Sequence, residues 1–249
     1  MSTYTSLEKN RKLCGTAAIA LIDPDYKNDS QLSKMLDLVN KSNFDAIFIG
    51  GSLISDNLFE MRVKYVKNNT DLPVIIFPGS SNQLSQYADA VLFLSLISGR
   101  NPQYLIDEHV KSAPIIRNLN LEPIPTAYIL LDGGIRSSVE IMSNTTPLPM
   151  DKHDIIVAHA LAGEYLGNKF VFLESGSGAQ NHTTSDIVGI LSDLLTIPII
   201  VGGGINSAES AKHLSNSGAS YIVTGTQLED APTIDDLLRF TEAVHLNEK

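Results

Sequence analysis

The chain has 249 residues, is 43% hydrophobic and 18% charged, and has a formal net charge of −10. This excess of acids argues against binding to nucleic acid or to an anionic membrane, because both attract proteins through clustered lysine and arginine. The single cysteine, Cys14, excludes an intramolecular disulfide, and no apolar run approaches the ~20 residues that cross a bilayer. Residues 1–12 are polar and unlike a signal peptide, so we expect a cytoplasmic protein that does not span the membrane.

Short β-branched segments alternate with longer amphipathic ones along the chain. This alternation predicts parallel strands joined by crossover helices. We predict eight strands, at residues 16–22, 46–49, 73–77, 90–94, 127–131, 170–173, 197–201 and 221–223. We predict helices at residues 30–41, 55–67 (with Ser55 as the cap), 102–117, 154–165, 184–195, 207–215 and 233–244. Residues 143–151, with two prolines, are predicted to form an irregular loop.

Eight such units without a break in composition favour one architecture. A chain of ~250 residues is the typical length of a (β/α)8 TIM barrel, and we predict one such domain over residues 1–249. The alternative is an open, doubly wound sheet, which would place a G-x-G-x-x-G phosphate turn after its first strand. The sequence has no such turn there.

The last three predicted strands each end in a glycine-rich turn. These turns contain Glu174 to Gly178, then Gly202, Gly203 and Gly204, then Gly225 and Thr226. Backbone N–H groups without side chains around them suit a bound phosphate, and barrels commonly hold phosphate after strands seven and eight. Glu174 is the only acid in the three turns, which indicates proton abstraction from a phosphorylated small molecule. The other interpretation is that the glycines merely make tight turns.

Other predicted strand ends carry polar side chains that would lie on the same face. Asp23 and Ser52 offer the hard oxygen ligands that suit Mg²⁺. Asp-Pro-Asp is also a common turn, and Ser after Gly-Gly is a common helix start, so both interpretations stay open. Asp132 and Arg136 are expected to form a local ion pair rather than to act in catalysis.

Taken in order, seven segments of the sequence resemble those of the geranylgeranylglyceryl phosphate synthases. They are Leu21-Ile22-Asp23-Pro24-Asp25, Ile49-Gly50-Gly51-Ser52, Ser98-Gly99-Arg100-Asn101-Pro102, Tyr165-Leu166-Gly167, Leu173-Glu174-Ser175-Gly176-Ser177-Gly178, Val201-Gly202-Gly203-Gly204-Ile205 and Thr224-Gly225-Thr226. Members of this family are (β/α)8 prenyltransferases that join sn-glycerol 1-phosphate to a polyprenyl diphosphate. Each motif alone is unspecific, but the ordered set over residues 19–228 is specific.

The resemblance implies a role for each matching position. It implies that Asp23 and Ser52 bind Mg²⁺ near the diphosphate, and that Glu174 lies at the attacking glycerol hydroxyl. The segments implied to hold glycerol 1-phosphate are Phe172, Leu173, Glu174, Ser175, Gly176, Ser177 and Gly178, then Gly203 and Gly204, then Gly225 and Thr226. The departing diphosphate is highly charged, so Arg100 and the metal are expected to stabilise it. We expect geranylgeranyl diphosphate as the donor and a homo-oligomer, either a dimer or a hexamer.

Two positions depart from the family pattern, and the chain is closer to the second branch of the family. Phe172 stands where the family often has Tyr, so a phenol contact to the glycerol would be missing. Leu21 stands where some members have Lys, which leaves the backbone N–H groups to bind the phosphate. Both departures bear on affinity more than on the type of reaction.

Two other functions compete with prenyl transfer. A phosphosugar isomerase or lyase barrel uses the same phosphate site, but it would pair Glu174 with a second acid or a lysine at a strand end, and we find no strand-end lysine. A non-catalytic phosphate-binding barrel would make Glu174 dispensable.

Overall fold

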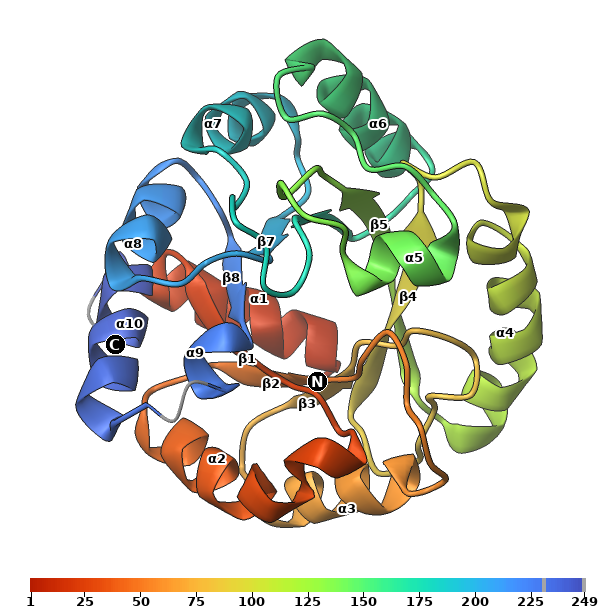
Figure 1. The fold of residues 1–249 in the computed structure, drawn as a ribbon, viewed down its shortest axis with the longest axis vertical. Helices are drawn as coiled ribbons and strands as arrows, with labels where there is room; N and C mark the ends of the chain where they lie inside the picture. The colour runs from red at the N-terminus through yellow and green to blue at the C-terminus, as the bar shows by residue number, and fades with distance from the viewer. Residues whose placement is uncertain (230–231, 248–249) are drawn as a thin grey trace.

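Eight parallel strands close into a barrel in the computed structural model, which describes residues 1–229 and 232–247 (Figure 1). Each strand pairs with its neighbour in the sequence, and the first pairs with the last. This arrangement confirms the predicted (β/α)8 fold. The strands are β1 (Ala17–Ile22), β2 (Ala46–Ile49), β3 (Val74–Ile76), β4 (Ala90–Leu96), β5 (Glu122–Leu130), β6 (Phe170–Glu174), β7 (Ile199–Gly202) and β8 (Tyr221–Thr224).

Helices surround the strands as a ring (Figure 1). They are α2 (Asp29–Lys41), α3 (Phe59–Asn68), α4 (Asp107–Leu119), α6 (His153–Tyr165), α7 (Ser185–Leu194), α8 (Ala208–Asn216) and α10 (Ile234–Val244). The shorter elements are η1 (Tyr26–Asn28), η2 (Pro102–Tyr104), α5 (Ser138–Ser143) and α9 (Thr226–Glu229). The predicted cap at Ser55 was wrong, because α3 begins only at Phe59 and the Ser55 amide instead donates to Asp25 at 3.3 Å.

The strands separate two apolar layers because successive side chains point to opposite faces. Ile19, Phe48 and Phe172 belong to the layer inside the barrel. Ala18 and Val63 belong to the layer between the strands and the helices. Both faces of each strand are therefore buried, which explains why the strands appear in the sequence as continuous apolar runs.

The third unit lacks the helix that eight regular β/α units would have. Residues 77–89 connect β3 to β4 without a helix. Gln83 holds this connection: its Oε1 accepts from the Gly79 amide at 3.2 Å, and its Nε2 donates to the Gly51 carbonyl at 2.7 Å. The connection is thereby bonded to the loop after β2.

Strand β5 starts at Glu122, five residues earlier than predicted, and its additional residues include two prolines. Pro123 and Pro125 pair with β4, whereas the register with β6 begins only at Thr126. A proline is tolerated where its missing N–H faces no partner strand. The prolines therefore lie where the sheet requires no donor toward β6.

An additional helix, α1 (Thr3–Cys14), closes the N-terminal end of the barrel. Leu7 is buried, the Tyr4 ring lies 5.4 Å from the Phe170 ring, and Glu8 accepts from the Tyr221 hydroxyl at 2.7 Å. From the sequence, residues 1–12 are predicted only to be polar. Its function in the fold depends on contacts with β6 and β8, which lie more than 150 residues away.

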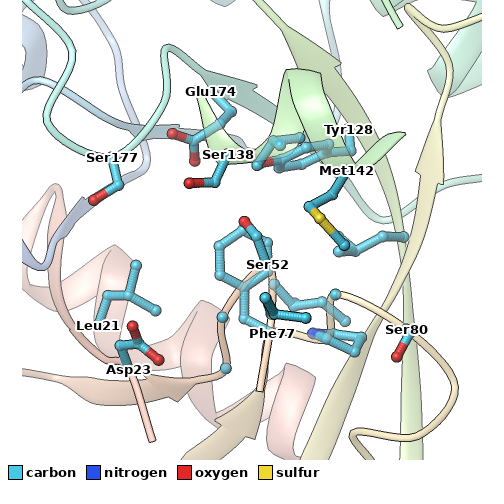
Figure 2. Close-up of a pocket in the computed structure, with 18 of the residues that line it drawn as sticks. Leu21, Asp23, Ser52, Phe77, Ser80, Tyr128, Ser138, Met142, Glu174 and Ser177 are labelled. Atoms are coloured by element: carbon cyan, nitrogen blue, oxygen red, sulfur yellow. The ribbon is translucent and has the colours of Figure 1, made fainter. Parts of the chain in front are cut away.

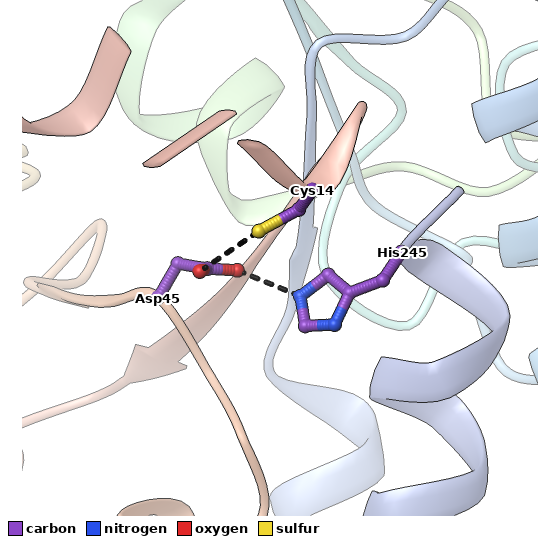
Figure 3. A group of neighbouring side chains, drawn as sticks. All are labelled: Cys14, Asp45 and His245. Atoms are coloured by element: carbon purple, nitrogen blue, oxygen red, sulfur yellow. Dashed lines mark hydrogen bonds and ion pairs between the residues drawn. The ribbon is translucent and has the colours of Figure 1, made fainter. Parts of the chain in front are cut away.

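A polar cluster of Cys14, Asp45 and His245 joins the last residue of α1, the residue before β2 and the residue after α10 (Figure 3). Asp45 accepts hydrogen bonds from the Ala18 amide at 2.8 Å, from His245 Nε2 at 2.9 Å and from Cys14 Sγ at 3.7 Å. These donors come from β1, from the residue after α10 and from the last residue of α1.

Within residues 1–229 and 232–247, no helix is long and apolar enough to cross a membrane.

Candidate active site

A cavity of about 560 Å³ opens at the C-terminal ends of the strands. It is lined by residues that follow β1, β2, β3, β6, β7 and β8. Glu174, Ser138 and Tyr128 lie along one side, and Leu21, Asp23 and Phe77 lie along the other (Figure 2). This is the end of a barrel at which active sites form.

Glu174 is the last residue of β6 and is 6% exposed. Its Oε1 accepts from the Gly176 amide at 2.7 Å, and its carboxylate also accepts from the Tyr128 hydroxyl. Burial raises the pKa of Glu174 to about 7, although both hydrogen bonds act to lower it. A carboxyl that titrates near neutral pH suits the acceptance of a proton from a substrate.

Tyr128 is a site residue that the sequence interpretation missed. It lies on β5 directly opposite Phe172 of β6, and their rings contact edge to face at 5.3 Å. Phe172 is fully buried and stacks on Phe77 at 5.1 Å, so it packs inside the barrel rather than lining the cavity. The phenol that Phe172 lacks is thus present on the neighbouring strand. The register between β5 and β6 was the missing signal.

The glycine turns after β6 and β7 depend on a left-handed backbone. Gly176, Gly203 and Gly204 have φ of 98°, 82° and 70°, values that side chains disfavour. A Cβ on Gly203 would lie 2.5 Å from Glu174 Oε1 and 2.6 Å from the Gly176 amide nitrogen. Gly203 therefore leaves room for the Glu174 carboxylate.

Gly225 differs from the other glycines in its surroundings. Its φ is not left-handed, and an added Cβ would meet nothing closer than the Leu21 carbonyl oxygen at 3.5 Å. The amide N–H groups of Gly203, Gly204 and Gly225 have no acceptor among the described residues. These donors at the cavity wall suit an anion.

The predicted phosphate segments line the cavity only in part. Glu174, Ser177, Gly203, Gly204, Gly225 and Thr226 line it. Five predicted contacts lie outside it, namely Phe172, described above, and four others. Leu173 packs between strands and helices, Ser175 Oγ lies 3.3 Å from Thr183 Oγ1, the Gly176 amide is bonded to Glu174, and Gly178 shapes the turn with φ of 69°.

Asp23 and Ser52 line the cavity opposite Glu174. Asp23 Oδ2 lies 3.1 Å from Lys27 Nζ, whereas Oδ1 is buried and has no hydrogen-bond donor among the described residues. A buried carboxylate oxygen without a partner is costly. Together with the Ser52 hydroxyl, this oxygen fits the hard-ligand set of a Mg²⁺ ion.

Lys27 is a second residue that the sequence interpretation missed. It lies in η1, four residues after Asp23, and among the described residues that line the cavity it is the one lysine or arginine. The fold of η1 turns it back toward the strand end. A cation is therefore present at this rim although β1 carries Leu21.

Two expectations about charged residues need correction. Arg100 does not line the cavity: its guanidinium lies against the carbonyls of its own loop at 3.4–3.5 Å and 3.4 Å from His159 Nε2. Its sequence position after a strand was not sufficient to aim it inward. Arg136 pairs with Glu140 at 3.2 Å rather than with Asp132, which accepts from the Gly134 amide.

The cavity continues from the polar end into an apolar groove beside β4. The groove is lined by Val91, Phe93, Leu94, Leu96, Ile116 and Met142. These side chains come from β4, α4 and α5. Their spacing in the sequence did not distinguish them from core residues.

The chain resembles known proteins over nearly its whole length. The PcrB family model matches residues 10–244. A geranylgeranylglyceryl phosphate synthase of Chitinophaga pinensis is 44% identical over 237 residues, which are 95% of this chain and 93% of the relative. The enzyme of the same name from Pyrococcus horikoshii is 39% identical over 225 residues, 90% and 88% of the two chains.

A solved structure is similar to the whole barrel. It is the (S)-3-O-geranylgeranylglyceryl phosphate synthase of Thermoplasma acidophilum in complex with its substrate sn-glycerol-1-phosphate. The TM-score is 0.92 at 33% sequence identity, with 98% of this chain and 99% of that chain covered.

Proposed function

Because this chain belongs to the PcrB family, we propose that it transfers a prenyl group from a polyprenyl diphosphate to sn-glycerol 1-phosphate. The product is an ether-linked prenylglyceryl phosphate, and diphosphate is released. The relatives named above are synthases of this kind, and the Thermoplasma acidophilum enzyme binds the same glycerol phosphate.

One arrangement carries the proposal: a buried acid with a pKa of about 7 lies beside unpaired amides on the turns after β7 and β8. The amides of Gly203, Gly204 and Gly225 bind the phosphate of glycerol 1-phosphate. The substrate hydroxyl then lies toward Glu174. A weakly acidic hydroxyl needs such a base when it acts as a nucleophile.

In the reaction, the glycerol oxygen forms a bond to the first carbon of the prenyl chain while Glu174 accepts the hydroxyl proton. The bond between that carbon and the diphosphate oxygen breaks, and the diphosphate leaves with the electron pair. Tyr128 donates to Glu174 and orients the carboxylate toward the cavity. Burial raises the pKa of Tyr128 well above 10, so this phenol stays a donor.

At the opposite wall, Asp23 and Ser52 are the residues that would hold Mg²⁺. When bound, the ion would supply positive charge that neutralises the departing diphosphate. Lys27 lies at the same rim, and we assign to it the cationic contact first expected from Arg100. The apolar groove beside β4 receives the hydrocarbon tail, which geranylgeranyl diphosphate would supply.

We also propose a homo-oligomer, either a dimer or a hexamer. Large apolar residues are exposed on α6, where Tyr165 is 79% exposed, and just after it, where Leu166 is 75% exposed. Light scattering coupled to gel filtration tests the assembly. The cytoplasmic location stays a prediction from the sequence.

The test incubates purified protein with sn-glycerol 1-phosphate, Mg²⁺ and prenyl diphosphates of increasing length, and detects the ether by mass spectrometry. sn-Glycerol 3-phosphate is the matched control substrate. Binding of glycerol 1-phosphate without any ether would favour a non-catalytic phosphate-binding barrel. Conversion of a phosphosugar would favour an isomerase or lyase.

A further inference from the structure

Arg62 of α3 is a buried cation that the mechanism does not use. Its side chain is 5% exposed and does not line the cavity. It forms a bidentate pair with Asp29, at 2.5 and 2.8 Å, and another with Asp56, at 2.7 Å for both contacts. Its Nη1 also donates to the Pro24 carbonyl at 3.0 Å. These contacts use all five N–H donors that a guanidinium carries.

The partners of Arg62 belong to two different loops of the site. Pro24 directly follows Asp23, and Asp29 begins α2, so both belong to the segment after β1. Asp56 lies four residues after Ser52, in the segment after β2. A further contact joins the same loops, because the Ser55 amide donates to Asp25. Arg62 is thus the main link between the Asp23 loop and the Ser52 loop.

We propose that Arg62 is a positioning residue that sets the separation of Asp23 and Ser52 and so the affinity for the metal-bound diphosphate. This inference rests on the proposed function, since it assigns the diphosphate to that wall. Glycerol 1-phosphate, by contrast, is bound by turns after β6, β7 and β8, which Arg62 does not touch. Replacing Arg62 should therefore weaken the binding of the metal-bound diphosphate and leave the binding of glycerol 1-phosphate unchanged.

Arginine is specifically suited to this position. A planar guanidinium binds two carboxylates in a fixed fork geometry, whereas a lysine ammonium has three donors and no fixed plane. The hydrogen bonds from Arg62 hold the pKa of Asp56 at about 2 and lower that of Asp29. Both acids therefore stay ionised at any pH at which the enzyme would be assayed, and both ion pairs with Arg62 persist.

The experiment compares two ligands by calorimetry: inorganic pyrophosphate in the presence of Mg²⁺, and sn-glycerol 1-phosphate. Arg62→Met should raise the Kd for Mg²⁺-pyrophosphate roughly 10- to 100-fold, the usual loss of affinity when a group that orients metal ligands is removed. The Kd for glycerol 1-phosphate should not change, which also shows that the variant is folded. Arg62→Lys should lie between Arg62→Met and the wild type.

Lys67→Met is the matched control. Lys67 lies on the last turn of the same helix and pairs with Asp89 at 2.6 Å, away from both loops. The Lys67→Met substitution also removes one positive charge and should leave both Kd values unchanged. Equal weakening of both ligands by Arg62→Met, or no weakening of either, would overturn the inference, as would a wild type that does not bind pyrophosphate. If the wild type binds pyrophosphate but makes no ether, the proposed function fails, while the two Kd values still test the positioning role of Arg62.

Discussion

At the scale of single residues, the chemistry depends on the surroundings of Glu174. The same carboxyl in water would be ionised well below neutral pH, but burial at the end of β6 raises its pKa to about 7. The neighbouring Tyr128 and Gly176 hold it by hydrogen bonds. The residue is thus a stronger base than an exposed glutamate and is already aimed at the cavity.

Glu174→Gln should reduce kcat by roughly 10²–10⁴-fold, the usual contribution of a positioned base. Glutamine has a similar size but accepts no proton. Binding of glycerol 1-phosphate should stay near that of the wild type, because the amides after β7 and β8 hold the phosphate. Calorimetry measures the binding of glycerol 1-phosphate, and the rate of product formation gives kcat. An unchanged kcat would exclude the base role, and loss of binding as well would make Glu174 a substrate-positioning residue.

The pH dependence follows from the same pKa. Glu174 acts when deprotonated, so kcat/KM should rise as the pH increases through about 7 and then level off. The Tyr128 hydrogen bond lowers this pKa, and Tyr128→Phe should therefore move the rise to higher pH. Pre-steady-state and steady-state rates over pH 5–9 would check both profiles. A Tyr128→Phe profile displaced to lower pH would contradict the assignment.

At the scale of elements, the loops after the strands divide the cavity into two walls. The turns after β6, β7 and β8 carry Glu174 and the unpaired amides, and the loops after β1 and β2 carry Asp23 and Ser52. Gln83 and Arg62 bond the second wall together from outside the cavity. Each wall can therefore be perturbed separately.

The two glycines at the first wall should respond differently to alanine. Gly225→Ala should keep the melting temperature, because the added Cβ meets nothing closer than 3.5 Å. It should still raise the KM for glycerol 1-phosphate, since the methyl group projects beside the phosphate. Gly203→Ala should lower kcat as well, because its Cβ would collide with Glu174 Oε1. Thermal melting and separate KM values for the two substrates make the comparison. Identical kinetics for the two variants would contradict the different roles assigned to Gly203 and Gly225.

At the scale of the whole molecule, the end of the barrel opposite the site contributes stability. Helix α1 covers that end, and the Cys14, Asp45 and His245 cluster ties α1, the start of β2 and the segment after α10 together. In TIM barrels the two ends divide these roles, with chemistry at the C-terminal end of the strands and stability at the other.

Asp45→Asn should destabilise the protein by about 2 kcal/mol or more, because a buried side chain that accepts three hydrogen bonds is replaced by one that presents N–H donors to other donors. For a chain of this size that corresponds to a melting temperature roughly 4–8 °C lower. Both KM values should stay unchanged. Asp37→Asn, at an exposed position of α2, is the control and should melt like the wild type. A changed KM with an unchanged melting temperature would contradict the assigned role.

Local sequence patterns determined the strands, most of the helices and the face that carries the site. Apolar runs that end in glycine turns predict a barrel strand with its loop, because buried parallel strands have no polar face and phosphate turns have no room for side chains. Glu174, Asp23, Ser52, Gly203 and Gly225 were all located on this basis, since each lies at the end of its strand or within three residues after it, and the carboxyl ends of parallel strands meet at one rim.

Tertiary structure decided whatever depends on contacts between distant segments. Strand register placed Tyr128 beside Glu174, and the turn of η1 brought Lys27 to the rim, while the loop after β4 turned Arg100 away. The function of α1 and the length of β5 depended on partner strands elsewhere in the chain. Burial, which raises the pKa of Glu174 to about 7, is a property of the closed barrel and not of the residue. A sequence pattern predicts local backbone conformation, whereas burial, strand register and side-chain direction arise only when the segments pack.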